Sequence, residues 1–245
     1  MFGNYDSKKV MFVLIAVGLI CLIFSGLMGG ANTNFIIAKL LIMPGLVLGL
    51  SIHEFSHAKM ADKLGDPTPE SQGRLTLNPL AHLDPVGTVC LFFAGFGWGK
   101  PVQIDSSYFR NPAKDNMLVA LAGPVSNIIL AFIFFLIHGI LYFFVPIDTT
   151  FGELFVDMFY YGAFINLSLG VFNLLPFPPL DGSKILSYFL KGKARGFIWS
   201  LEKYSWIILM ILFITNIPQL LITPIVDWLA NAMYWVVLQI MVLFI

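Results

Sequence analysis

Charged residues are scarce in this sequence: Asp, Glu, Lys and Arg together make up 11% of its 245 residues. A soluble domain has about 25%, so this chain has too few polar side chains to cover a core in water. Lys plus Arg number 14, as do Asp plus Glu, and a chain without net charge has no overall field that attracts nucleic acid. These features exclude a soluble globular enzyme and a disordered protein, and we expect no nucleic-acid partner.

Cysteine is also rare. Cys21 and Cys90 are the two present, far apart and within apolar stretches, which excludes a disulfide scaffold and a thiolate metal site. Hydrophobic residues, in contrast, make up 58% of the chain. The composition predicts an all-α polytopic membrane protein.

Apolar runs long enough to cross a bilayer, which takes about 20 residues, mark about six transmembrane helices. They cover residues 10–28, 40–58, 117–144, 158–175, 204–221 and 224–245. The first run follows Lys8 and Lys9 and ends among small residues, so a cleaved signal peptide is an alternative to a retained span. Gly45 and Gly49 favour close packing of the second span on the fourth, although ordinary membrane glycine usage explains them equally well.

The positions of Lys and Arg predict the orientation. If the N-terminus is cytoplasmic and the spans alternate, Lys39 alone among these residues falls on the outer side. One connection, from residue 59 to residue 115, is long and contains the apolar stretch 86–98, which is too short to span. Non-helical backbone at membrane depth must be buried in protein or line a wet cavity, so we expect a partly membrane-embedded loop or β region after the second span.

The second span ends in an H-E-x-x-H motif, residues 53–57 (HEFSH). Residues four apart share a helix face, so His53 and His57 can each present a ring nitrogen to one metal ion. Glu54 points about 100° away around the helix, where it can reach a metal-bound water. The alternative is a helix end with ordinary polar residues, but polar groups at the end of an apolar span are usually functional.

A catalytic zinc takes three protein ligands, and the third is open at this point. Glu70 and His82 are possible in principle, although His82 fits a structural loop residue better. Asp181 is the favoured candidate because three nearby prolines force extended backbone and place its carboxylate on a rigid turn at the membrane depth of His57. Its alternative role is the N-cap of a short helix over residues 182–190.

Together these motifs resemble the site-2 protease family of intramembrane zinc metalloproteases. The likeness is carried by residues 53–57 (HEFSH), 74–87 (RLTLNPLAHLDPVG), 97–102 (GWGKPV), 120–127 (ALAGPVSN) and 173–182 (NLLPFPPLDG). It covers most of residues 45–190. The chain leaves no room for an inserted PDZ or CBS domain, so it is similar to the compact prokaryotic members.

The resemblance implies one zinc ion per chain, held by His53, His57 and Asp181, with Glu54 as the general base. It further implies that Asn173 lies near the zinc and helps to hold the reacting carbonyl. The expected substrate is a peptide bond in or near a transmembrane segment of another protein within the lipid.

Further expectations concern the surroundings of the site. We expect one transmembrane metalloprotease domain over residues 1–245, with a catalytic core at about 35–190 and the first, fifth and sixth spans peripheral. The expected location is a prokaryotic cell membrane, with the N-terminus and the active-site end cytoplasmic. The residues expected to line the substrate cleft are Asn127, Gly97 and Gly99.

Two other functions compete with a protease. A zinc transporter or metal-binding membrane protein needs polar residues across the membrane, and the spans offer scattered candidates such as Asn127, His138 and Asp227. An inactive homologue that only binds substrate has no need for a general base, so the intact Glu54 argues against it.

Overall fold

The computed structural model describes residues 33–85, 87–88, 99–144, 147, 149–215 and 217–244. Over these residues the chain is helical, and its one strand-like pairing is an isolated antiparallel bridge between Leu83 and Gly99. The all-α prediction is confirmed, whereas the β region is not. The helices are α2 (Thr33–Lys63), α3 (Thr68–Ser71), α4 (Pro79–His82), the 3₁₀ turn η1 (Ser106–Tyr108), α6 (Pro112–Phe144), α7 (Thr150–Asn173), α8 (Asp181–Phe189), α9 (Gly192–Glu202), α10 (Ser205–Ile214) and α11 (Ile217–Val242).

Four helical segments among the described residues are long and apolar enough to cross a membrane: Ile37–Lys63, Pro112–Phe144, Thr150–Asn173 and Gln219–Val242. They match the second, third, fourth and sixth expected spans, and they make the chain an integral membrane protein. The first expected span, 10–28, lies outside the described residues, as does most of the stretch 86–98.

The fifth expected span, 204–221, is divided between α10 and the start of α11. α10 has 10 residues, about 15 Å of helix against a hydrocarbon core of about 30 Å. Pro218 lies in the first turn of α11, where a helix needs no N–H donor. Because proline has no N–H, it could not extend the hydrogen bonds of a helix that came before it. The predicted count of six spans is therefore not confirmed.

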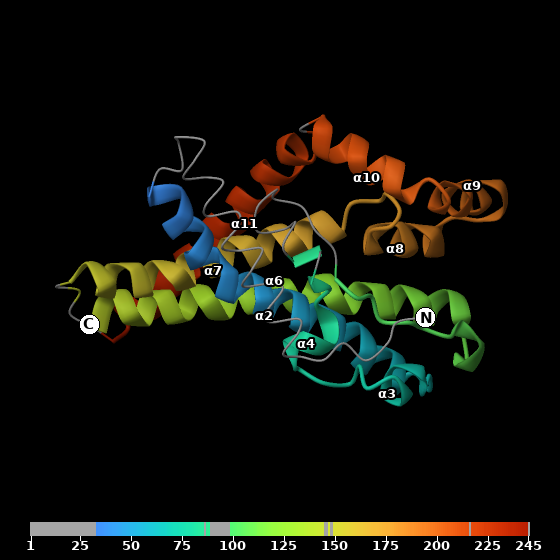
Figure 1. Cartoon of the computed structure of the whole chain (residues 1–245), viewed down its shortest axis with the longest axis horizontal. Helices are drawn as coiled ribbons and strands as arrows, with labels where there is room; N and C mark the ends of the chain where they lie inside the picture. Colours follow the sequence, from blue (N-terminus) through green and yellow to red (C-terminus); the bar gives the residue numbers. More distant parts are fainter. Residues whose placement is uncertain are drawn as a thin grey trace.

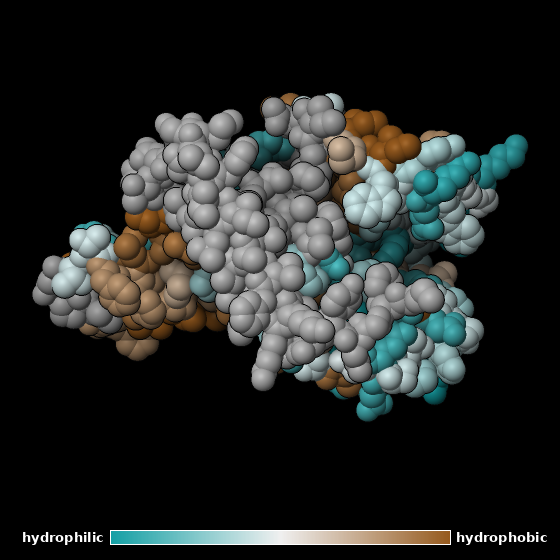
Figure 2. Space-filling model, in the orientation of Figure 1, coloured by the Kyte–Doolittle hydropathy of each residue, from teal (hydrophilic) through white to brown (hydrophobic). Residues whose placement is uncertain are grey.

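α6 and α7 lie side by side along the longest dimension of the molecule, with α11 packed on both and α2 crossing them (Figure 1). α8 packs on α6 near the opposite end from the C-terminus (Figure 1). On the face that Figure 2 shows, hydrophobic residues cover the end where α6 meets α7 and also α10, and hydrophilic residues gather around α3 and α9. The hydrophilic residues thus lie away from the long apolar helices, as expected where a chain leaves the membrane.

The main apolar core joins α6, α7 and α11. In lipid, helices gain little from hydrophobic transfer, so close packing holds such a core together. Its buried members are Leu130, Ala131, Phe134 and Phe135 of α6, Ala163, Leu167 and Val171 of α7, and Val226, Ala230, Val237 and Met241 of α11.

α2 joins the bundle through glycine. A Cβ atom added to Gly45 would lie 2.5 Å from the Cα atom of Gly162 on α7, so the two backbones touch directly. A Cβ atom at Gly49 would overlap the side chain of Asn166, one helical turn further along α7. The predicted close packing of the second span on the fourth is confirmed, because only glycine permits this approach.

Candidate active site

The two histidines of the H-E-x-x-H motif lie on one face of α2. Their Nε2 atoms are 3.0 Å apart, and the two residues are 6% and 8% exposed. The spacing of four residues produces this proximity, as predicted, because α2 is continuous through the motif.

Asp181 reaches the histidines from a separate part of the chain. α7 ends at Asn173, and the proline-rich residues 174–180 turn back before α8 begins. A Cβ atom at residue 182 would overlap the carbonyl oxygens of Leu174 and Leu175, so the turn can be this tight because Gly182 follows Asp181. The Asp181 Oδ2 atom lies 3.2 Å from His53 Nε2 and 3.1 Å from His57 Nε2.

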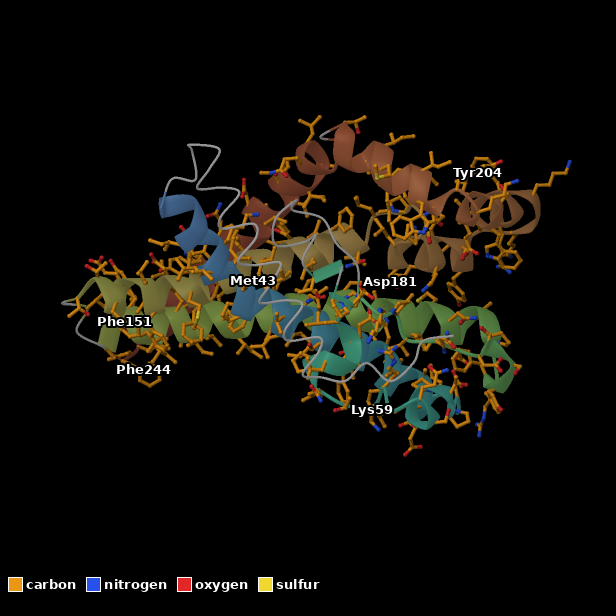
Figure 3. The ribbon with its side chains drawn as sticks, in the orientation of Figure 1. Met43, Lys59, Phe151, Asp181, Tyr204 and Phe244 are labelled. Atoms are coloured by element: carbon orange, nitrogen blue, oxygen red, sulfur yellow. The ribbon has the colours of Figure 1, made fainter. Side chains whose placement is uncertain are left out.

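The alternative role of Asp181 as an N-cap is wrong. Asp181 is the first residue of α8, and the N-cap position belongs to Leu180, which makes no side-chain capping hydrogen bond. Its carboxylate points instead towards α2 and α6, near the middle of the molecule (Figure 3).

The donor atoms of this group suit a metal ion. Val119 O accepts from His57 Nδ1 at 2.7 Å, and because a carbonyl can only accept, His57 carries its proton on Nδ1 and leaves Nε2 as a lone pair. Ligands about 2.0–2.1 Å from a tetrahedral zinc lie roughly 3.3 Å apart, close to the separations seen here. His53, His57 and Asp181 form the group of described residues able to hold a metal ion.

Gly123 on α6 leaves the space that such an ion needs. A Cβ atom at this position would lie 2.5 Å from His57 Nε2 and 2.6 Å from His53 Nε2. Any larger residue would therefore cover the two nitrogens. Pro124 follows and lacks the N–H that would bond to the carbonyl of Ala120, so this turn of α6 has one backbone hydrogen bond fewer.

A cation lies beside the buried carboxyl group of Asp181. Burial raises the pKa of this group, and the charge of the Lys184 ammonium lowers it. The Lys184 Nζ atom lies 3.6 Å from Asp181 Oδ1, the oxygen that faces away from the histidines. An ionised carboxylate is the form that binds a metal.

Glu54 stands apart from the three ligand atoms. Its Oε2 atom accepts a hydrogen bond from the backbone N–H of Val102 at 3.0 Å. The segment 99–102 is held in turn by the bridge at Gly99 and by Lys100, whose N–H donates to His82 O at 2.7 Å. One carboxylate oxygen of Glu54 is thus fixed by backbone, and no described residue is found to hydrogen-bond to the other.

The remaining predicted residues take different places. Asn173 lies half-buried in the last turn of α7, and its amide donates to Leu169 O at 3.0 Å. Asn127 is fully buried behind His53, at 2.6 Å from its Nδ1 atom. Gly99 pairs with Leu83 at the start of the segment 99–102 that binds Glu54, whereas Gly97 lies outside the described residues.

Neither alternative third ligand joins the group. Glu70 is exposed on α3. His82 is buried in α4, where its Nε2 atom hydrogen-bonds to Thr76 O at 2.7 Å. This contact agrees with the interpretation of His82 as a structural residue of the loop.

Sequence reasoning missed two residues that shape this site, Gly123 and Asn166. Gly123 lies within the stretch 120–127 but was not singled out. Asn166 is an amide in the middle of an apolar span, and that rarity alone was a signal, since polar groups at membrane depth are costly.

A bundle of membrane-spanning helices that buries two histidines of an H-E-x-x-H motif beside an aspartate belongs to the class of membrane-embedded metalloproteases. The family model described as "Peptidase family M50" matches residues 41–215. The chain therefore belongs to this family, the site-2 proteases. The family assignment and the His53, His57 and Asp181 group together identify zinc as the cofactor.

Several curated proteins are similar to the chain. "Putative zinc metalloprotease YwhC" of Bacillus subtilis is 39% identical over 199 residues, covering 79% of this chain and 91% of that protein. "Putative zinc metalloprotease Rip2" of Mycolicibacterium smegmatis is 30% identical, covering 80% and 72%. "Putative zinc metalloprotease MJ0611" of Methanocaldococcus jannaschii is 30% identical, covering 81% and 90%. No solved structure matches the chain at a significant level.

Proposed function

We propose that this protein is a zinc metalloendopeptidase that cuts peptide bonds in or near transmembrane segments of other proteins. The observation that carries the proposal is the convergence of His53, His57 and Asp181, within 3.2 Å of one another, beside a glutamate that is not one of the ligand candidates. Three ligands and a separate carboxylate are what hydrolysis by a zinc enzyme needs.

The residues divide the chemistry between them. His53, His57 and Asp181 would hold zinc, which when bound acidifies a water to a pKa of about 7 and polarises the carbonyl under attack. Glu54 accepts the proton of the attacking water and passes it to the departing amide nitrogen. The Val102 N–H fixes one oxygen of Glu54, so the other oxygen can face the water.

Asn173 is proposed to stabilise the carbonyl oxygen as it gains negative charge. It lies at the end of α7, just before the turn that carries Asp181. To do so its amide must exchange the hydrogen bond to Leu169 O for one to the substrate. Gly99, next to the segment that holds Glu54, is proposed to line the path of the substrate.

The proposed substrate lies in the membrane with its cleaved bond near the cytoplasmic face. Lys and Arg residues other than Lys39 fall on one side of the expected spans, which favours a cytoplasmic N-terminus and active-site end. A helical substrate must unwind locally before cleavage, because its carbonyls are otherwise bonded within the helix. Residues 35–190 would form the catalytic core.

The arrangement supports a protease over a zinc transporter. A transport path needs ligands at successive depths, and the described residues contain one group of three metal-ligating side chains. His138 is buried with an unpartnered Nδ1 atom beside the rings of Tyr142, Tyr160 and Tyr234. The carboxylate of Asp157 is near enough to act on it electrostatically, but these two side chains belong to no group of three ligands among the described residues.

The test compares the wild type with Glu54→Gln, each co-expressed with a panel of single-span membrane proteins. We expect Glu54→Gln to keep its zinc, measured by elemental analysis of the purified protein, and to lose cleavage by at least about 100-fold. Glu70→Gln, which removes an exposed glutamate of α3, is the matched control and should cleave as the wild type does. Unchanged cleavage by Glu54→Gln, or a wild type without zinc, contradicts the proposal.

A further inference from the structure

Two buried asparagines connect the metal-ligand group to the helix bundle behind it. Asn127 of α6 and Asn166 of α7 are both 0% exposed, and their side chains hydrogen-bond to each other across the helix interface at 3.0 Å. Buried amides in an apolar bundle are costly unless every polar atom has a partner. Their hydrogen bonds therefore show what the pair is arranged to do.

The donor and acceptor roles in this network are fixed first at Asn166. Its Nδ2 group donates both protons to backbone carbonyls, to Gly45 O at 2.9 Å and to Gly162 O at 2.8 Å. The Asn166 amide cannot be turned over, because its oxygen would then face two carbonyl oxygens. Its Oδ1 atom must accordingly point to Asn127 as an acceptor.

The orientation of the Asn127 amide follows from Asn166 and determines which atom faces His53. Its Nδ2 group donates to Asn166 Oδ1 at 3.0 Å and to Gly49 O at 3.1 Å. With both amide protons used, Asn127 presents an oxygen to His53 Nδ1 at 2.6 Å. The imidazole must then carry its proton on Nδ1 and leave Nε2, the atom facing Asp181, as a lone pair.

We propose that Asn166 and Asn127 form an amide relay that fixes the tautomer and orientation of His53 for zinc binding. The relay consists of these two side chains, anchored on the carbonyls of Gly45, Gly49 and Gly162. The proposal rests on the proposed function, since it assigns the relay to a zinc ligand. Asn127 and Asn166 are positioning residues that act through His53, and this role replaces the cleft-lining role expected for Asn127.

The two histidines differ in how they are supported. His57 Nδ1 donates to the main-chain carbonyl of Val119, and no side-chain substitution removes that acceptor. His53 depends on side chains from two other helices. Partners behind a metal ligand typically change metal affinity by about 10–100-fold when they are lost, so His53 is the ligand that the packing of α7 can weaken.

The experiment measures zinc affinity of the full-length protein in detergent, by competition with a chelator of known affinity and by the visible absorption of the cobalt-substituted protein. The variants are Asn166→Leu, Asn127→Leu and the double variant, because leucine has the same branching and number of heavy atoms as asparagine but forms no side-chain hydrogen bond. Leu167→Ala is the control: this neighbour of Asn166 is also 0% exposed but belongs to the apolar core.

We expect Asn166→Leu to weaken zinc binding by about 10-fold and Asn127→Leu by about 10–100-fold, with altered cobalt spectra. In the double variant the loss should not exceed that of Asn127→Leu, because Asn166 acts only through Asn127. Leu167→Ala should lower the melting temperature and leave zinc affinity within about 2-fold of the wild type.

Two results overturn the relay. One is an Asn166→Leu protein that, like Leu167→Ala, loses stability but keeps its zinc affinity and cobalt spectrum. The other is a double variant whose loss equals the product of the two single losses. A wild type that binds no zinc would instead refute the proposed function, so the two failures are distinguishable.

Discussion

The helices of the bundle meet in two different ways at two junctions. Around the metal-ligand group, α2, α6 and α7 touch through glycines and through buried amides that hydrogen-bond across the interfaces. Towards the other end, where Phe151 and Phe244 lie (Figure 3), α6, α7 and α11 meet through aliphatic and aromatic side chains. The first junction is held by hydrogen bonds, which are directional, and the second by the packing of apolar side chains, which depends on their volume.

This difference shows what each junction is suited to. Hydrogen bonds have preferred angles and a fixed donor and acceptor, so they can hold a histidine ring in one orientation. Apolar contacts tolerate small shifts and substitutions of similar volume, so they hold the helices together without placing any one atom. The catalytic geometry is therefore expected to be sensitive at the first junction and insensitive at the second.

The largest expected effect comes from adding one methyl group at each junction. Gly49→Ala places a Cβ atom on the Asn166 side chain, so it should cost about 1–3 kcal/mol of stability and weaken zinc binding about 10-fold or more. Gly139→Ala places a Cβ atom 2.6 Å from Val237 Cγ1, a side chain of the apolar core. It should lower stability alone, as thermal unfolding and chelator competition would show.

A zinc affinity that falls equally in the two alanine variants would remove the distinction between the junctions. The same would follow if Gly49→Ala bound zinc as tightly as the wild type does.

A smaller effect is expected from trimming the apolar junction. Phe135 is 0% exposed and packs edge-on against Tyr160, Phe164 and Tyr234, with centroids 5.7–6.1 Å away. Phe135→Leu loses these aromatic contacts and should destabilise the fold by about 1–2 kcal/mol. Cleavage per folded molecule, measured below the melting temperature, should stay within about 2-fold of the wild type. A larger loss of cleavage would show that the two junctions are coupled.

The smallest effect is expected at the surface next to the site. The Lys184 side chain is 56% exposed, and its Nζ atom is 3.6 Å from Asp181 Oδ1. Exposed ion pairs contribute little because water screens them, so Lys184→Met should change zinc affinity by less than about 3-fold. A greater change would mean that Asp181 depends on this charge, and that the site is less self-contained than its hydrogen bonds indicate.

Much of the site could be predicted because its signals are local. The spacing of His53 and His57 is a property of one helix, and the helix forms as expected. Asp181 was found because the prolines before it dictate a turn, and that turn does bring the carboxylate to the histidines. The assigned roles of Glu54 and Asn173 stay predictions until they are measured.

The rest needed contacts between distant residues. Nothing near Asn166 in the sequence indicates that its oxygen faces Asn127, because that orientation depends on two carbonyls, one of them on α2. The hydrogen bond from Val102 to Glu54 joins residues 48 positions apart. The extent of α10 was also misjudged, because apolar composition measures lipid compatibility and not where a helix is interrupted.

Composition and periodicity by themselves determined that this chain lies in a membrane and that two histidines and a glutamate share one end of a helix. These follow from local energetics: apolar residues leave water, and a helix repeats every 3.6 residues. Only the tertiary structure decided which nitrogen of His53 is free to bind zinc. That choice depends on hydrogen bonds from three helices, and their directions exist only once the helices have packed.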